Sequence, residues 1–383
     1  MDDQRSTHFD QMGEKTKKKR KSRKENKESE SSYESQQADT HIEDILRLAV
    51  TSKVSDVHFT IGVPPIFRKN GELRLLDEEG ILTNDQTLSY ARALCTKERW
   101  DTYQAMGEVD LAYEIKAVSR YRVNIFKQKG NTSIAIRLIP TAIPKMDSLF
   151  LPEVLKEMIQ KHQGLFLVTG PTGSGKSTTL ASMIDHLNRT QKKHVITLED
   201  PIEYVHNHAS SIIDQREVGV DTQSFANGLR AALRQDPDII LVGEMRDFET
   251  ISIALTAAET GHLVLGTLHT SSAASTIERL VDVFSPEQQS QIRTQLAGAL
   301  VGILAQRLLP NQNHSGRVVA TEMLVNTKSI ANLIRSDKTH QIANMLQMGR
   351  DLGMHTMESS LTQLIQNHGV DVSVAEAMME GGD

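Results

Sequence analysis

The sequence predicts an α/β protein with two domains: a small α+β domain, then a mainly parallel sheet that carries a phosphate-binding loop. Three observations support this expectation. Strand-like runs and hairpin turns fill residues 41–142, and short apolar strands alternate with helical segments from residue 151 onward. A Gly-rich loop lies between one of these strands and a helix.

Residues 1–40 differ in composition from everything that follows. The basic stretch KTKKKRKSRK is followed by the acidic, Ser-rich stretch ENKESESSYESQQ. A segment with so little apolar surface is expected to be disordered. It either serves only as a solubilising tail or makes a peripheral contact with anionic lipid, where each basic residue contributes about 1 kcal/mol.

Composition and charge argue against several classes of protein, among them nucleic-acid binders, membrane-spanning proteins and secreted proteins. The 383 residues carry a net charge of −6, which argues against a dedicated nucleic-acid binder, and no apolar run is long enough for a membrane span. The N-terminus lacks the apolar core of a secretory signal. The single cysteine, Cys95, excludes an internal disulfide and a Cys-rich zinc site. We therefore expect a reduced, cytoplasmic protein without zinc.

The first domain begins with a helical spacing of apolar residues from Ile42 to Ala49, followed by the strand DVHFTIG. Asn70-Gly71 separates two strand-like runs and predicts a hairpin turn. A helical stretch is expected over 85–106, and YRVNIF and SIAIRLI form a further strand pair. The segment PTAIPKMDS ends the domain, and residues 143–150 are expected to form a linker.

The second domain, residues 151–383, shows a different pattern. LFLVTG, HVITLED, IILVGE and LVLGTLH are short apolar strands, and helical segments such as SFANGLRAALRQ and FETISIALTAAETG lie among them. This alternation predicts a parallel sheet with helices on its faces. The stretch 285–380 is expected to be chiefly helical, including PEQQSQIRTQLAGALVGILAQRLL.

The segment LVTGPTGSGKSTTL matches a P-loop completely and stands where one is expected, after an apolar strand and at the start of a helix. Its backbone N–H groups and the helix N-terminus would hold phosphates, Lys176 would reach the β- and γ-phosphates, and Ser177 would bind Mg²⁺. The alternative is a chance match in a Gly-rich loop. The nucleotide-binding candidates are Gly170, Pro171, Thr172, Gly173, Ser174, Gly175, Lys176, Ser177 and Thr178.

Acidic residues follow two other predicted strands. ITLEDPIEY contains Glu203 after Glu199 and Asp200, and IILVGE ends in Glu244. A P-loop enzyme needs one acid near Mg²⁺ and another to orient the attacking water. The spacing alone does not assign these roles between Glu203 and Glu244, and either could be an ordinary polar loop residue.

His262 and His269 flank the strand LVLGTL. Each is either a structural hydrogen-bonding group or a sensor of phosphate. Zinc is not expected, because no further Cys or His is placed to complete four ligands.

Together these motifs resemble the PilT family of type IV pilus retraction ATPases, among the secretion-type RecA-like ATPases. TLEDPIEY looks like the family's Asp box, ILVGEMRD like its atypical Walker B segment, and GHLVLGTLHTSSA like its His box. SDVHFTIGVPP and RYRVNIF resemble its N-terminal domain, so the resemblance spans 41–365. It implies a PAS-like first domain, a RecA-like ATPase domain and a homohexameric ring that hydrolyses ATP with Mg²⁺.

The resemblance also implies roles for single residues. Glu203 would orient the attacking water, Glu244 would support Mg²⁺ through water, and His262 and His269 would be γ-phosphate or interface sensors. Three arginines of the first domain would close on the phosphates, within one chain or across subunits; the alternative for them is a solvated strand face. They are Arg120, Arg122 and Arg137.

The implied work is the disassembly of a pilus filament at the inner face of the cytoplasmic membrane, through a PilC-like inner-membrane platform protein. One departure concerns this output. The family's motif AIRNLIRE stands here as SIANLIRS, with Ala331 in place of Arg and Ser336 in place of Glu.

Three other functions are alternatives to retraction. An assembly ATPase of the PilB or GspE type typically has a long extra N-terminal domain and a tetracysteine zinc element, which this sequence lacks. An accessory PilU-like subunit would modulate a paralogous retraction ATPase. A DNA-translocating ATPase is disfavoured by the acidic net charge.

Overall fold

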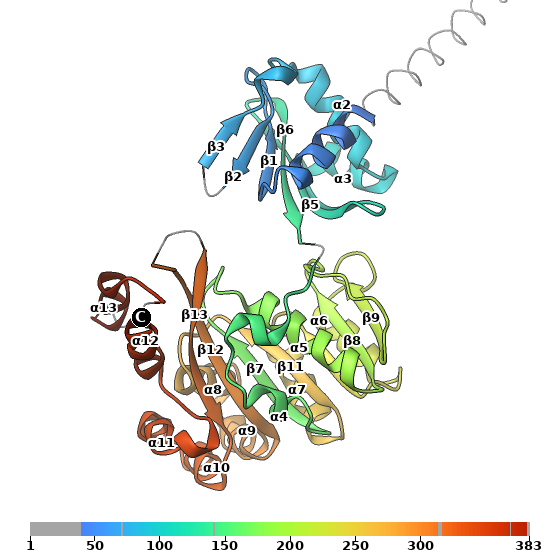
Figure 1. Cartoon of the computed structure of the whole chain (residues 1–383). Helices are drawn as coiled ribbons and strands as arrows, with labels where there is room; N and C mark the ends of the chain where they lie inside the picture. The colour runs from blue at the N-terminus through green and yellow to red at the C-terminus, as the bar shows by residue number, and fades with distance from the viewer. Residues whose placement is uncertain (1–39, 70–71, 141, 313–315, 368, 381–383) are drawn as a thin grey trace, which may run out of the picture. The chain divides into compact units, whose positions relative to one another are not determined.

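The computed structural model describes residues 40–380, apart from 70, 71, 141, 313–315 and 368, and divides into two compact units, Met1–Pro140 and Thr141–Asp383 (Figure 1). The charged tail predicted for 1–40 lies, except for residue 40, outside the described residues. The predicted linker contains the 3₁₀ turn η2 (Met146–Leu149). Met146 is buried in an apolar cluster of the second unit, so this stretch packs onto that unit.

The first unit is a six-stranded antiparallel sheet in the order β3-β2-β1-β6-β5-β4. Apolar residues of its helices and strands form one cluster, so the helices cover one face of the sheet. The predicted α+β fold class is confirmed. Its elements are a helix over 40–51, β1 (Asp56–Phe59), β2 (Ile66–Lys69), β3 (Glu72–Leu75), η1 (Asp77–Glu79), α2 (Asn84–Leu94), α3 (Lys97–Met106), β4 (Glu108–Ile115), β5 (Ser119–Gln128) and β6 (Asn131–Ile139).

Local sequence explains most of these boundaries. β5 and β6 are joined by Lys129 and Gly130, whose φ angles of 49° and 80° fit a two-residue hairpin turn. The predicted helical stretch 85–106 is two helices, because Thr96 caps a second one. The turn residues Asn70 and Gly71 lie outside the described residues, although the strands on either side pair antiparallel.

The second unit is a seven-stranded sheet in the order β13-β12-β7-β11-β10-β8-β9, parallel except between β12 and β13. The four strands predicted for this domain are present, and the sequence did not predict β9, β12 or β13. The strands are β7 (Gly164–Thr169), β8 (His194–Glu199), β9 (Ile212–Glu217), β10 (Ile239–Val242), β11 (Leu263–Leu268), β12 (Leu300–Pro310) and β13 (Arg317–Val325).

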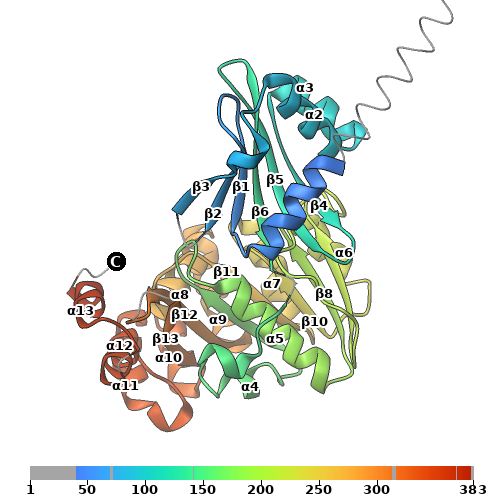
Figure 2. The ribbon, with the colours of Figure 1, turned by 45° about the horizontal axis from the view of Figure 1, so that its top comes forward.

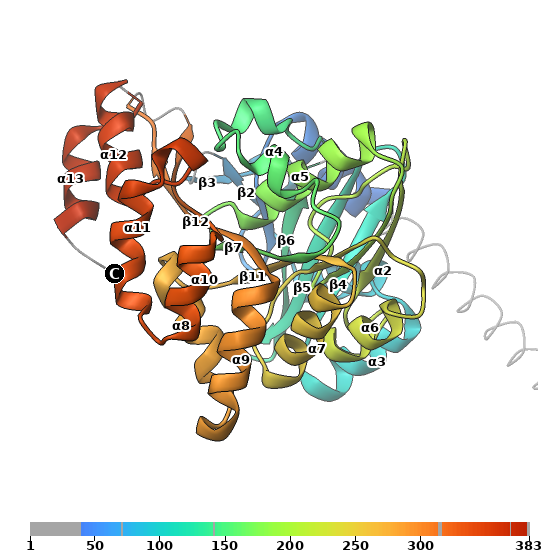
Figure 3. The same ribbon diagram turned by 90° about the horizontal axis from the view of Figure 1, so that it is seen from below.

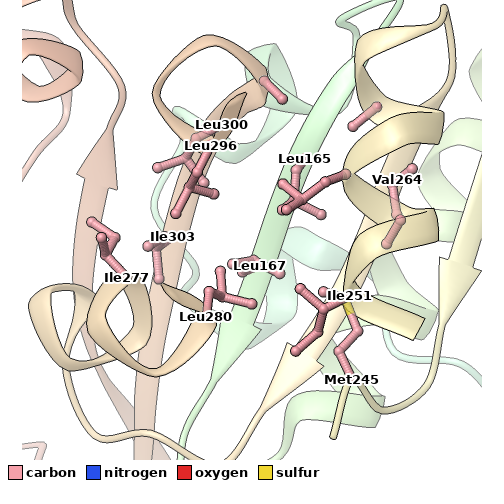
Figure 4. Close-up of a cluster of buried hydrophobic side chains, with 14 of the residues drawn as sticks. Leu165, Leu167, Met245, Ile251, Val264, Ile277, Leu280, Leu296, Leu300 and Ile303 are labelled. Atoms are coloured by element: carbon pink, nitrogen blue, oxygen red, sulfur yellow. The ribbon is translucent and has the colours of Figure 1, made fainter. Parts of the chain in front are cut away.

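Helices lie on both faces of this sheet (Figures 2 and 3). On one face, Phe166 and Val168 of β7 pack with α4 (Leu155–Met158) and α5 (Lys176–Thr190). Leu165 and Leu167 point to the other face (Figure 4). The helices there are α6 (Phe225–Ala232), α7 (Phe248–Glu259), α8 (Ala273–Asp282), α9 (Pro286–Ala299), α10 (Lys328–Arg335) and α11 (Ile342–Met348).

One expectation for the C-terminal region is wrong. The run LAGALVGILAQRLL was expected to continue a helix, but α9 ends at Ala299 and β12 begins at Leu300. β12 lies between β7 and β13, so its residues are buried on both faces and show no polar alternation. A short apolar run of this kind cannot be told from a buried helix by periodicity.

β13 is a second strand in the stretch that was expected to be chiefly helical, and the segments after it are helical. SIANLIRS lies in α10 and its C-cap: Ile330, Ala331 and Ile334 are buried, and Arg335 is exposed. The chain continues through η3 (Thr339–Gln341), α11 (Ile342–Met348), η4 (Arg350–Leu352), α12 (Met357–Gln366) and α13 (Val372–Glu380). Among the described helices, none combines the length and the apolar character needed to cross a membrane.

Candidate functional site

The candidate site lies at the carboxyl ends of the parallel strands in the second unit. β7, β11, β10 and β8 are neighbours in that order, so the loops that follow them come together at one edge of the sheet. The loop after β7 runs from Gly170 to Gly175, and α5 begins at Lys176. All nine predicted nucleotide-binding residues therefore lie in this loop or in the first turn of α5.

All three glycines of the loop have a positive φ that other residues rarely adopt, and two of them shape the site. Gly170 has a φ of 143°, and a Cβ there would lie 2.2 Å from the carbonyl oxygen of Gln306. Gly175 is the N-cap of α5, with a φ of 89° and no side-chain capping bond. The loop thus brings its backbone into close contact with β12 and leaves the first N–H groups of α5 available to an anion.

Lys176 folds back over the loop. Its ammonium donates to the carbonyl oxygens of Gly170 at 2.7 Å and of Pro171 at 3.1 Å, and it lies 3.5 Å from Nδ1 of His269. Burial lowers the pKa of Lys176 from its ordinary value, while the carboxylates of Glu244 and Glu203 act to raise it. Lys176 and the two predicted acids therefore share one electrostatic environment.

Glu244 and His269 are in direct contact. His269 Nε2 lies 2.7 Å from Glu244 Oε1, and Arg246 is also paired with this carboxylate. Thr267 donates its hydroxyl to the carbonyl of Gly243 at 2.5 Å, which fixes the backbone just before Glu244. The structure thus connects the ends of β10 and β11 through an acid, an imidazole and a guanidinium.

Glu203 is exposed, in a loop that a buried network holds after β8. Glu199 accepts hydrogen bonds from Thr197 at 2.6 Å and from the amide of Gln215 at 3.0 Å. The same amide donates to the carbonyl of Tyr204 at 2.8 Å. Burial raises the pKa of Glu199, and these donors together with the N–H of Glu203 act to lower it.

A second hydrogen bond joins this loop to the P-loop helix. The hydroxyl of Tyr204 lies 2.9 Å from that of Thr178, in the first turn of α5. The loop that carries Glu203 is therefore held by two contacts of Tyr204, one with Gln215 of β9 and one with Thr178 of α5.

His262 lies apart from this group. It precedes β11, whereas His269 follows it, so the two histidines are separated by the whole strand, about 20 Å. The ring Nδ1 of His262 lies 3.1 Å from the carbonyl oxygen of Ala257 in α7. His262 therefore lies at the end of β11 away from the P-loop of its own chain, and its role as a γ-phosphate or interface sensor stays a prediction.

The three predicted arginines belong to the first unit. Tyr121 and Val123 of β5 are buried in its core, so Arg120 and Arg122 lie on the opposite face of the sheet. Arg137 is directly opposite Arg122 in the β5–β6 register. Arg137 Nε donates to Asp56 Oδ1 at 3.0 Å, which leaves the other N–H groups of its guanidinium for a second partner. All three therefore share one face, and their action on phosphates stays a prediction.

Several residues of the site could not be found from the sequence. Gln306 of β12, wholly buried, bonds to the P-loop from a segment far along the chain. Gln215 lies on β9, a strand that was not predicted. Arg246 stands in the quoted motif ILVGEMRD, but nothing in its spacing pointed to the carboxylate of Glu244. Only contacts in three dimensions identify such residues.

The assembled groups suit the binding and cleavage of a polyphosphate. The loop supplies backbone N–H groups and a cation, and two separate loops supply carboxylates beside it. Hydroxyl and carboxylate oxygens, those of Ser177 and Glu244, are also the ligands that Mg²⁺ prefers.

Comparison with known proteins agrees with this arrangement. The family model described as type II/IV secretion system protein matches residues 32–381. The type IV pilus retraction ATPase PilT of Pseudomonas aeruginosa is 44% identical over 324 residues, covering 85% of this chain and 94% of that protein. The type IV pilus ATPase PilU of the same organism is 38% identical over 322 residues, 84% of each chain.

A solved structure is similar over nearly the whole chain. The crystal structure of the pilus retraction motor PilT with bound ADP has a TM-score of 0.83 and 45% identity, covering 89% of this chain and 96% of that one. The fold class predicted from the sequence is confirmed by this likeness. The chain belongs to the family of type II/IV secretion system proteins.

Proposed function

We propose that this chain is an ATP-hydrolysing motor that powers the retraction of type IV pili. One observation carries the proposal: a likeness to the retraction ATPase PilT that extends over 85% of the chain and includes a complete P-loop beside two acids. The products of its reaction are ADP and phosphate. The crystal structure of PilT with bound ADP supports nucleotide binding at this P-loop.

The residues have distinct parts in the proposed reaction. The P-loop N–H groups and Lys176 bind and orient the phosphates, and Lys176 exchanges its two carbonyl partners for phosphate oxygens. Glu203, exposed at the end of its loop, orients the attacking water. His269 contacts both Lys176 and Glu244, which supports its proposed role as a sensor of the γ-phosphate.

Magnesium is the proposed metal. The oxygens of Ser177 and Glu244 fit it, and Glu244 acts through a water molecule because Arg246 and His269 already contact its carboxylate. When bound, Mg²⁺ neutralises charge that develops on the phosphate oxygens.

We further propose a homohexamer that acts on an inner-membrane platform protein of the PilC type, at the cytoplasmic face of that membrane. The candidate phosphate-binding arginines lie on the first unit and the P-loop lies on the second. In the proposed ring, closure of a first unit on bound nucleotide would couple nucleotide binding to movement of that unit. The basic tail would add a peripheral lipid contact.

The experiment is a count of surface filaments on host cells whose only copy of the protein carries Glu203→Gln. Excess filaments that fail to retract support the proposal, whereas cells without filaments would show that the motor extends them. The matched control is Glu157→Gln, an exposed acid on α4 away from the site. It should leave filament number and retraction unchanged.

An accessory, PilU-like role is the second candidate, and the 38% identity to PilU supports it. It predicts an unchanged filament count in the Glu203→Gln strain, because hydrolysis by another ATPase would suffice. ATP turnover by the purified protein separates the two candidates further. A main motor hydrolyses ATP, and Glu203→Gln abolishes that activity while leaving ATP binding in place.

A further inference from the structure

We propose that Gln306 is a positioning residue for the P-loop: its side-chain amide holds the Ser174–Gly175 peptide so that the Gly175 N–H faces the nucleotide phosphates. The inference rests on the proposed function, because it concerns nucleotide binding at the same loop. It adds to that site a residue from β12, on the far side of β7 from β11.

The contacts of Gln306 all go to the P-loop region. Its Nε2 donates to the carbonyl oxygen of Ser174 at 2.6 Å, and its Oε1 accepts from the hydroxyl of Thr179 at 3.0 Å. The side chain is 1% exposed. A carbonyl oxygen can only accept, so the bond to Ser174 fixes which way round the amide lies.

The bond to Ser174 has a direct consequence for the next residue. A trans peptide is planar, so its C=O and N–H point in opposite directions. When the carbonyl of Ser174 points toward Gln306, the N–H of Gly175 points away from β12. Gly175 is the N-cap of α5, the end of the helix at which an anion is favoured.

The backbone of β12 restricts the loop at its other end. β12 runs parallel to β7, and Ala305 pairs with Thr169, the last residue of β7. The carbonyl oxygen of Gln306 lies so close to Gly170 that a Cβ there would be 2.2 Å away. One residue of β12 therefore touches both the start and the end of the loop.

Burial explains why the residue is a glutamine. A fully buried amide is costly unless its donor and acceptor are both used, and here they are. An apolar side chain of similar size would fill the same space but would leave the Ser174 carbonyl buried and free to rotate. We therefore assign the amide to loop geometry.

The test is the equilibrium affinity of the purified full chain for fluorescent ADP, in wild type and Gln306→Met. Methionine has a similar length and no amide, so the affinity should fall about 5- to 150-fold, the range expected for an unpaired buried carbonyl. Wild-type affinity in folded Gln306→Met would overturn the inference. A wild type that does not bind ADP would instead overturn the proposed function.

The matched control is Thr321→Val. Thr321 lies directly opposite Gln306 in the β12–β13 register and is also buried, but its hydroxyl bonds to His355 at 2.9 Å, away from the P-loop. It should lose stability and keep ADP affinity within about twofold. An equal loss of affinity in both variants would mean that any damage to β12 has this effect, which would contradict a specific role for Gln306.

Two further variants separate the two hydrogen bonds. Gln306→Leu removes both of them and should bind ADP as weakly as Gln306→Met. Thr179→Val removes only the bond to Oε1 of Gln306 and should bind nearly as wild type. The reverse order would overturn the inference. Gln306→Leu also carries the test if Gln306→Met fails to fold.

Discussion

The close approach of Gly170 to β12 predicts that adding one methyl group, in Gly170→Ala, lowers both the stability of the protein and its affinity for nucleotide. In Gly170→Ala the new Cβ would lie 2.2 Å from the carbonyl oxygen of Gln306 and 2.7 Å from the hydroxyl of Ser174. The carbonyl belongs to β12, a strand that is paired on both sides, and cannot rotate away. The loop must therefore move, and with it the N–H groups that would bind phosphate.

The size of the effect follows from two contributions. Overpacking costs about 1–3 kcal/mol, and a side chain at a φ of 143° costs about 1–3 kcal/mol more. We expect Gly170→Ala to lower the free energy of unfolding by about 4 kcal/mol. Gly173→Ala is the matched control, because Gly173 also has a positive φ but no atom within 4 Å of its Cβ position. It should lose only about 1 kcal/mol.

Urea unfolding of the two variants, monitored by circular dichroism, measures both changes in the free energy of unfolding. The affinity of each variant for ADP shows whether the P-loop still binds phosphate. Gly170→Ala should lose measurable binding. If it unfolds within about 1 kcal/mol of wild type, or if Gly173→Ala is equally damaged, the reasoning about close packing against β12 is refuted.

Three more predictions concern other contacts. Burial lowers the pKa of His206 to about 4, and its ring Nδ1 has no hydrogen-bond partner in the part of the chain that the structure describes. As the pH falls from about 6.5 to about 4, the unfolded chain binds a proton at His206 that the folded chain does not bind, so the wild type should lose about 3 kcal/mol of stability over that range. Urea unfolding at several pH values should show that His206→Leu lacks this loss, and equal acid sensitivity of the two proteins would refute the prediction. Tyr204→Phe loses the bond to Thr178, so it should lose about 1 kcal/mol of stability and turn over ATP more slowly with unchanged ADP affinity; unchanged turnover would count against a positioning role. Arg293 on α9 has a side chain that is 11% exposed, and it is paired at 2.7 Å with Asp337, which is 66% exposed, so Asp337→Ala should cost about 1 kcal/mol in thermal unfolding, more than Arg293→Met, and the opposite order would show that the pair itself is not needed.

The sequence predicted the parts of the fold that depend on local signals. The four apolar strands of the second unit stand between polar segments, and the P-loop has a fixed spacing of glycines, so both could be recognised without a structure. β12 was misread as helix because a strand buried on both faces has no alternation. The boundary between α9 and β12 depends on pairing with the neighbouring strands β7 and β13, so the local sequence does not predict it.

The residues of the candidate site likewise fall into those that local motifs predict and those that only the folded structure reveals. Lys176, Glu203, Glu244 and His269 follow strand ends, and their position in the motifs was enough to single them out. The separation of His262 from this group depends on the direction of β11, which is settled only once the sheet is parallel. Gln306 is invisible to any local pattern, because its partners lie 127 and 132 residues earlier.

That sequence separation also orders events during synthesis. The P-loop motif leaves the ribosome long before β12, the strand that lies against it, so a nascent chain carries the full motif without the carbonyl and amide that shape it. Contacts between distant segments also form late in folding because loop closure must precede them. A fragment that ends at α9 would thus contain every residue of the motif and expose the edge of β7 to other chains. We expect such fragments to aggregate rather than to bind nucleotide.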